Sequence, residues 1–174
     1  MYKRIFESTV NKLYTLQNTE NYENSIFLAG PTYRIKNDID LNKRSWRKDA
    51  IDIFESLNFE GTLIIPEWVN DIKPKGWTYS KQVKWEVENL DKCSIILFWI
   101  PRNLKQLPAF TTNVEFGYYL DNPKSIAGSP MNAEKNQYLI ERFNMIGKIW
   151  YDNLEDLCKY AMNLAKLRTN KYRV

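Results

Sequence analysis

Residues 94–100 constrain the fold more than any other part of this chain. Their sequence, SIILFWI, is apolar without the alternation of polar and apolar residues that a strand with one solvated face shows. Such a run indicates a β-strand that is covered on both faces, as in a parallel sheet between two layers of helices. Comparable short runs are found at 26–29, 62–66, 125–128 and 148–151.

Segments with helical periodicity separate these strands. The first such segment begins with Asn42 or Ser45 as its cap and has apolar residues at helical spacing up to residue 57. Further helices are predicted at 80–90, from residue 112, near 133–143 and at 153–167. Strands that alternate with helices predict an α/β fold with helices on both faces of a parallel sheet. Five strands suit a flavodoxin-like three-layer sandwich of strand order 2-1-3-4-5, although periodicity alone does not fix the order.

The length of 174 residues suits one domain with a substantial core. We expect this domain at 25–168, after an N-terminal extension at 1–24 that reads equally as a helical stripe or an extended arm. A basic tail follows at 169–174. The net charge is +4, and apart from this tail the basic residues are interspersed with acidic ones. This pattern indicates a solvated surface and argues against a nucleic-acid partner.

The composition excludes several kinds of catalytic site. The chain has no histidine, so Ser-His-Asp triads, Cys-His dyads and His-ligated zinc are impossible. Cys93 and Cys158 lack metal-binding spacing and are expected to be buried free thiols in a reducing compartment. Without an apolar leader or a run of about 20 apolar residues, we expect a cytoplasmic protein with no metal or organic cofactor and no membrane partner.

The carboxyl ends of the predicted strands gather the candidate functional residues. Open α/β sheets bind ligands at this edge. Gly30 there permits close approach of the backbone or an unusual φ angle. The candidates, in chain order, are Gly30, Pro31 and Thr32 after the first strand, Trp68 after the second, and Thr111, Thr112, Asn113 and Glu115 after the third.

Glu115 is the leading candidate for a working residue. With Thr112 as the N-cap, Glu115 falls at the third helical position, where the helix N-terminus favours an ionised carboxylate. Such a group could be a nucleophile or an electrostatic anchor. The same spacing also matches a capping box, in which Glu115 would only bond the backbone of the cap.

The other candidates also have two interpretations. Glu86 lies at the border of the stripe expected to be buried, Val83, Val87 and Leu90, and would either enter the pocket beside Glu115 or reach solvent. The turn 111–113 supplies donors for a phosphate or a sugar hydroxyl, or ordinary helix caps. Arg47 would pair with a ligand phosphate or lie at the surface, and Trp68 would stack on a base or pack in a core or interface.

Six segments together resemble the nucleoside 2-deoxyribosyltransferase-like family. The nearest branch is the divergent one that is described only as "nucleoside 2-deoxyribosyltransferase like". The six segments are IFLAGPT (26–32), SWR (45–47), PEW (66–68), WEVENLD (85–91), ILFWIP (96–101) and TTNVEFG (111–117). The resemblance covers roughly residues 25–160. Each motif is weak alone, and their order and spacing make the match specific.

This resemblance implies a flavodoxin-like fold, an N-glycosidase or deoxyribosyltransferase activity, and a homodimer or larger homo-oligomer whose neighbouring subunit closes the pocket. Glu115 matches the nucleophile of the family and Glu86 its second acid. Residues 30–32 match the loop of the base and sugar pocket. The transferases carry an additional Asp before the nucleophile, where this chain has Ala109, Phe110 and Thr111. Hydroxyl side chains before the nucleophile are also a trait of those branches of the family that hydrolyse nucleoside monophosphates.

With the resemblance added, we favour a functional role for Glu115, which its position at a helix start does not forbid. The leading hypothesis is cleavage or exchange of the N-glycosidic bond of a nucleoside or nucleoside monophosphate through a covalent glycosyl-Glu115 intermediate. A second hypothesis is a non-catalytic nucleotide-binding or sensing module that uses the same pocket. A third is an interaction protein with tryptophans at its interface.

Overall fold

The computed structural model describes residues 3–4, 22–33, 45–67 and 75–171. It contains a six-stranded sheet and five helices. The strands are β1 (Lys3–Arg4), β2 (Ser25–Ala29), β3 (Thr62–Ile64), β4 (Ile95–Trp99), β5 (Ser125–Gly128) and β6 (Trp150–Tyr151). The helices are α1 (Trp46–Ser56), α2 (Tyr79–Lys92), α3 (Phe110–Tyr119), α4 (Gln137–Met145) and α5 (Leu154–Lys171).

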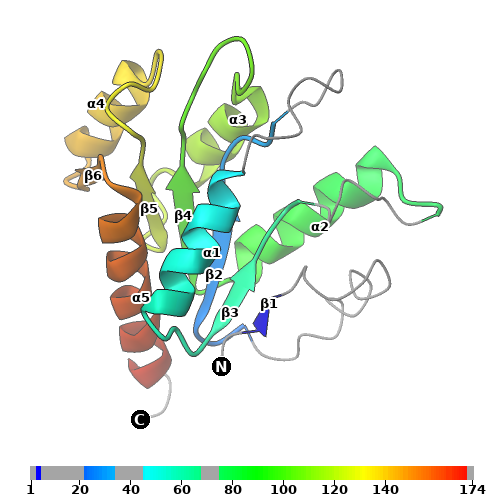
Figure 1. The fold of residues 1–174 in the computed structure, drawn as a ribbon, viewed down its shortest axis with the longest axis vertical. Helices are drawn as coiled ribbons and strands as arrows, with labels where there is room; N and C mark the ends of the chain where they lie inside the picture. The colour runs from blue at the N-terminus through cyan, green and yellow to red at the C-terminus, as the bar shows by residue number, and fades with distance from the viewer. Residues whose placement is uncertain (1–2, 5–21, 34–44, 68–74, 172–174) are drawn as a thin grey trace.

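All the strand pairs are parallel, in the order β1-β3-β2-β4-β5-β6. The five strands predicted from the sequence therefore pair in the flavodoxin-like order 2-1-3-4-5. The two-residue strand β1, from the predicted extension, adds an edge beside β3. Figure 1 shows α1 and α5 on one face of the sheet and α2 and α3 behind it. The result is a three-layer α/β fold.

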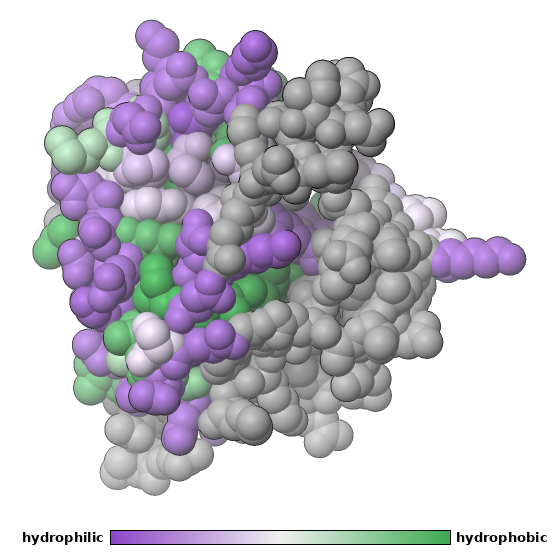
Figure 2. All heavy atoms as spheres, in the orientation of Figure 1, coloured by the Kyte–Doolittle hydropathy of each residue, from purple (hydrophilic) through white to green (hydrophobic). Residues whose placement is uncertain are grey.

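The central strands β2 and β4 are buried along their whole length, as their unbroken apolar sequences predict. Phe27 of β2 packs against Trp85 of α2, with ring centroids 6.2 Å apart. Phe98 of β4 meets Phe116 of α3 edge-to-face at 5.3 Å. On the other face, α5 buries Leu157, Cys158 and Ala161 completely. Hydrophilic residues cover much of the described surface on this side, with apolar side chains visible between them (Figure 2).

Helix α3 begins earlier than the sequence predicts. Its N-cap is Ala109, which adopts a left-handed φ of 60° and provides no side-chain capping bond. Glu115 is therefore the sixth residue of α3, and the capping box with Thr112 as the cap is wrong. Glu115 lies too far along the helix to bond the backbone of the cap. This removes the structural interpretation that competed with a functional one.

The buried side of α2 also differs from the prediction. Val83 and Val87 are 40% and 48% exposed, whereas Trp85 and Asn89 are buried together with Leu90. The predicted stripe is wrong for the two valines because the aromatic Trp85 packs on β2 and sets which side of α2 faces the sheet. Glu86, next to Trp85, stays half-buried at the edge of this contact.

Most of the other predicted elements are present with shifted ends. Ser45 caps α1 by accepting a hydrogen bond from the backbone N–H of Arg47. The helix expected near 133–143 starts only at Gln137, because residues 130–136 form turns. α5 runs to Lys171, so the start of the predicted basic tail continues the last helix. Cys93 and Cys158 are buried and free, as predicted.

Candidate active site

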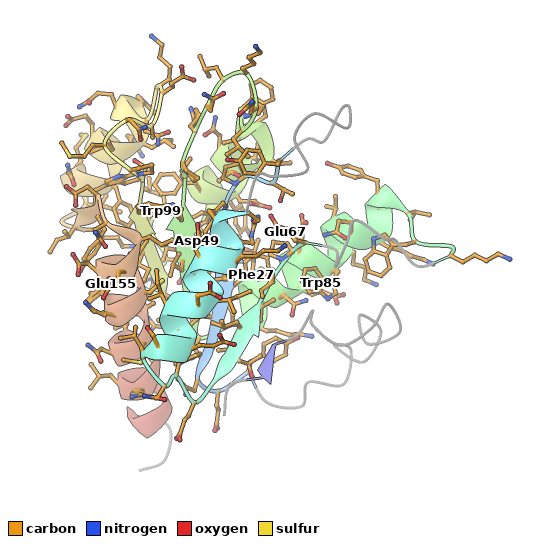
Figure 3. All side chains as sticks on the ribbon, in the orientation of Figure 1. Phe27, Asp49, Glu67, Trp85, Trp99 and Glu155 are labelled. Atoms are coloured by element: carbon orange, nitrogen blue, oxygen red, sulfur yellow. The ribbon has the colours of Figure 1, made fainter. Side chains whose placement is uncertain are left out.

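The carboxyl ends of β2, β3 and β4 meet beside the N-terminal end of α1 (Figure 1). Three described segments follow these strands: the loop 30–33, the turn that contains Glu67, and the loop that leads to α3. Figure 3 shows Glu67 next to the start of α1, on the side of α2. This edge of the sheet is where open α/β folds bind their ligands.

The loop after β2 requires glycine at position 30. Gly30 has a φ of 153°, which side chains rarely adopt. A side-chain carbon there would lie 2.2 Å from the carbonyl oxygen of Trp99 and 2.8 Å from the ring of Trp46. The indole Nε1 of Trp46 donates to the carbonyl of Pro31 at 3.0 Å. Pro31 is buried and Thr32 is exposed, so the loop offers Thr32 to solvent from a fixed backbone.

Arg47 fixes this loop from beneath. Its side chain is 1% exposed. Its guanidinium donates to the carbonyls of Leu28 at 2.9 Å and Gly30 at 2.6 Å, and to the hydroxyl of Thr32 at 3.0 Å. It also forms an ion pair with Glu67 at 2.7 Å. Because these partners occupy the guanidinium, its contacts favour a positioning role over the direct phosphate contact expected for Arg47.

Glu115 and Glu86 are brought together from neighbouring helices. Burial and, to a smaller extent, the charge of Glu86 raise the pKa of Glu115 to about 7, against the opposing charge of Arg47. Burial likewise raises the pKa of Glu86, against a hydrogen bond from Gln82 and the charge of Arg47. Near neutral pH, Glu115 therefore exists in both its protonated and ionised forms. Neighbouring carboxyl groups whose pKa values are both raised are typical of acid–base or nucleophilic sites.

A short chain of hydrogen bonds orients Glu86. The amide of Gln82, one turn earlier on α2, donates to Glu86 Oε1 at 2.6 Å. The indole Nε1 of Trp77 in turn donates to Gln82 Oε1 at 3.0 Å. The orientation of Gln82 is thus set by Trp77, so that its amide nitrogen faces the carboxylate. This contact holds Glu86 in one place while burial keeps its pKa high.

The N-terminus of α3 forms the other side of the candidate site. Thr111 is exposed, whereas Thr112 is 2% exposed and packs inward. Arg102, 8% exposed, donates from Nη2 to the amide oxygen of Asn113 and from Nη1 to the carbonyl of Lys135 at 3.2 Å. Its Nε has no partner within the described part of the chain. The first turn of α3 therefore has backbone N–H groups without a side-chain cap, and the buried guanidinium of Arg102 lies next to it.

Of the residues predicted from the sequence, Glu115, Glu86 and Arg47 lie close enough to affect one another electrostatically. Gly30, Pro31 and Thr32 lie on the loop that Arg47 holds. Trp68 lies outside the described residues. Sequence reasoning missed Glu67 as a partner of Arg47 and Arg102 as a partner of Asn113. The segment PEW contained the signal for Glu67, an acid directly after a buried strand.

The raised pKa of Glu115 has a measurable effect on stability. The folded protein keeps this proton up to about pH 7, whereas the carboxyl group otherwise ionises near pH 4.5. Ionisation therefore costs the folded state free energy as the pH rises through this window. We expect Glu115→Gln to raise the free energy of unfolding by on the order of 2 kcal/mol near pH 8 and not at about pH 4.

Urea denaturation at both pH values measures this difference. Glu88→Gln is the matched control, because the Glu88 side chain is 48% exposed on α2. It should change the stability little at either pH. An equal gain for Glu115→Gln at both pH values would show that ionisation of Glu115 is not its source.

The described residues form neither a metal-binding cluster nor a membrane-spanning helix. No group of three or more Cys, Asp and Glu side chains among them could hold a metal ion. None of their helices combines the length and apolar character that a crossing of the bilayer requires.

Comparison with known proteins identifies the family. The family model described as "Nucleoside 2-deoxyribosyltransferase like" matches residues 23–132, well over half of the 174-residue chain. This match contains the loop after β2, Arg47, Glu67, Glu86 and the start of α3 with Glu115. A search of the curated proteins finds no match. The fold and the matched segment agree, and the chain belongs to the nucleoside 2-deoxyribosyltransferase-like family.

Proposed function

We propose that this protein is an enzyme that cleaves or exchanges the N-glycosidic bond of a nucleoside or nucleoside monophosphate. The observation that carries the proposal is that Glu86 and Arg47 both act on the ionisation of Glu115, at the edge of the sheet where open α/β folds bind ligands. Membership of the family supports the same class of reaction. The chain lacks histidine, so carboxyl groups are the strongest acid–base candidates in this cluster.

The proposed reaction has two displacements. A carboxylate oxygen of Glu115 attacks C1′ while the bond from C1′ to the base nitrogen breaks, and the departing base takes a proton from Glu86. Water, or a second base, then attacks C1′ and releases the Glu115 carboxylate, while Glu86 accepts the proton of the attacking group. Two inversions retain the anomeric configuration. Burial raises the pKa of Glu86, and this favours the protonated form that a proton donor needs.

The surrounding residues would bind the rest of the substrate. In this proposal Gly30, Pro31 and Thr32 border the base and sugar, with Trp68 as a stacking partner and Arg47 as the support of the loop. The turn of Thr111, Thr112 and Asn113 binds the 5′ end. The uncapped start of α3 next to the buried Arg102 favours an anion, and hence a 5′-monophosphate over a neutral nucleoside.

Chromatographic detection of free base tests this function. The protein is incubated with a panel of ribo- and deoxyribonucleosides and their 5′-monophosphates, each with and without a second base. Release without an acceptor indicates a hydrolase, and a new nucleoside formed only with an acceptor indicates a transferase. Tight binding without release from any member of the panel would contradict the proposal and favour a non-catalytic nucleotide sensor.

We also propose that the protein is a homodimer or larger homo-oligomer, in which a neighbouring subunit closes the site. The supporting observation is an exposed apolar stripe on α3, formed by Phe110, Val114 and Tyr118 at 65%, 73% and 80% exposure. These residues recur every four positions, so they lie on one side of the helix. The half-exposed Val83 and Val87 add apolar surface on α2. Apolar surface of this kind is typical of interfaces.

Val114→Lys should weaken this assembly by placing a charge in the apolar contact. We expect light scattering after size-exclusion chromatography to show the mass of a monomer for the variant and a multiple of it for the wild type. Ile149→Lys is the control, because Ile149 is 71% exposed but lies on neither α2 nor α3. A monomeric wild type, or equal masses for wild type and Val114→Lys, would count against this interface.

A further inference from the structure

Ser45, Arg47 and Glu67 form one hydrogen-bonded unit, here called the Arg47 cluster. Arg47 Nη1 donates to Glu67 Oε1 at 2.7 Å. The hydroxyl of Ser45 lies 2.8 and 2.7 Å from the two carboxylate oxygens of Glu67 and accepts from the backbone N–H of Arg47 at 3.2 Å. The cluster therefore ties the end of β3 to the first turn of α1.

Glu67 is the charged partner of this buried cation. The other acceptors of Arg47 are neutral: the carbonyls of Leu28, Gly30 and Pro31 and the hydroxyl of Thr32. Within the described ranges, the ion pairs of Arg47 involve only Glu67. A buried guanidinium needs such compensation, because an unpaired charge is costly away from water. Glu67 thus decides how much of the Arg47 charge remains uncompensated.

Arg47 faces the two acids of the candidate site as well. Its charge acts on Glu86 from α2 and on Glu115 from α3, and in both cases it favours the ionised form. The other described groups that influence these acids are Gln82, which is neutral, and the two acids themselves. The Arg47 cluster therefore supplies the positive charge that opposes burial and mutual repulsion of the two carboxylates.

We infer that Glu67 is a positioning residue, which holds and partly neutralises Arg47 so that the guanidinium supports the loop after β2 rather than pairing with Glu86 or Glu115. This inference rests on the proposed function for its catalytic meaning. The sequence pattern that encodes it is an acid three residues after β3 together with Ser and Arg at the start of α1. Glu67 touches neither substrate nor reacting atoms in this role.

Glu67→Gln removes the charge and keeps the shape. The amide oxygen still accepts a hydrogen bond from Arg47, but the positive charge is no longer compensated. Arg47 then stabilises the ionised forms of Glu86 and Glu115 more strongly, so the pKa of both groups falls. We expect the pKa of Glu115 to fall by roughly 0.5–1 unit. The acid limb of the pH profile for base release should move to lower pH with it.

Carboxyl-carbon NMR of protein labelled with ¹³C-glutamate measures the titration directly, and Glu115→Gln assigns the signal of Glu115. Glu88→Gln removes an exposed charge from α2 and should leave the pKa of Glu115 unchanged. Glu67→Asp keeps the charge but draws it back from Arg47. It should also lower the pKa of Glu115, but by a smaller amount than Glu67→Gln does. This variant serves as the test if Glu67→Gln does not fold.

An unchanged pKa of Glu115 in folded Glu67→Gln, with only a lower melting temperature, would overturn the inference and leave Glu67 a purely structural residue. A rise in this pKa would overturn it too. The titration needs no substrate. Failure of the wild type to release any base would therefore count against the proposed function, while the electrostatic role of Glu67 would still be decided by the NMR result.

Discussion

Glu115→Gln is expected to reduce base release by roughly 10⁴-fold or more while the protein stays folded. The amide has almost the shape of the carboxyl group but cannot attack C1′, so the first displacement is lost. Glu86→Gln should have a smaller effect, about 10²–10⁴-fold, because a base with a good leaving tendency departs without full protonation. Chromatography of free base under saturating substrate measures both variants.

The two variants are compared with Glu88→Gln, which changes an exposed carboxylate of α2 and should keep full activity. Circular dichroism and melting curves verify that each variant is folded. Glu115→Ala adds a chemical test. It leaves space in which an external anion such as azide or formate can attack C1′, and partial recovery of base release would identify the missing nucleophile. Undiminished turnover by Glu115→Gln would remove Glu115 from the reaction.

Gly30→Ala should destabilise the protein strongly. The new methyl group would lie 2.2 Å from the carbonyl oxygen of Trp99 and 2.8 Å from the Trp46 ring, at a φ of 153° that alanine rarely adopts. Neither neighbour gives way easily, because Trp99 ends the central strand β4 and Trp46 is 5% exposed in the core. We expect a loss of about 3 kcal/mol or more in the free energy of unfolding.

Gly117→Ala is the matched control within the same chain. Gly117 lies inside α3, and a side-chain carbon there meets nothing within 4 Å. Since alanine is the better helix former, this substitution should raise stability by about 0.5–1 kcal/mol. Urea denaturation of both variants beside the wild type gives the comparison. Similar stability of Gly30→Ala and wild type would mean that the loop after β2 can shift without cost.

The layered fold could be predicted because its signals are local. The strands β2, β4 and β5 are mostly apolar and fully buried, and Ser45, one of the two caps that the sequence offers, caps α1. Which side of a helix is buried was harder to predict. Val83 and Val87 have the spacing of a buried stripe, but packing of Trp85 on Phe27 turns α2 so that both are exposed. Tertiary contacts, which periodicity does not contain, decide such cases.

The two acids, Arg47 and the loop after β2 could be identified from the sequence, whereas the partners of Arg47 could not. Glu67 and Arg47 are 20 residues apart, and their ion pair forms only because β3 lies beside β2. The start of α3 could not be predicted for a related reason. Ala109 takes a left-handed conformation without a capping side chain, so no residue type in the sequence marks the boundary. Long-range pairing and unusual backbone angles leave little trace in one sequence.

The position of α5 in the chain has a consequence for how the protein is made. This last helix packs against α1 and the strands β2, β4, β5 and β6, and it buries Leu157, Cys158, Ala161 and Ala165 completely. The part of the sheet face that lies beside α1 therefore stays uncovered until residues 154–171 have left the ribosome. The apolar strands are exposed to aggregation during this interval, as in other folds with non-local contacts. We expect nascent chains that stop before α5 to need chaperones, even though they already contain every candidate catalytic residue.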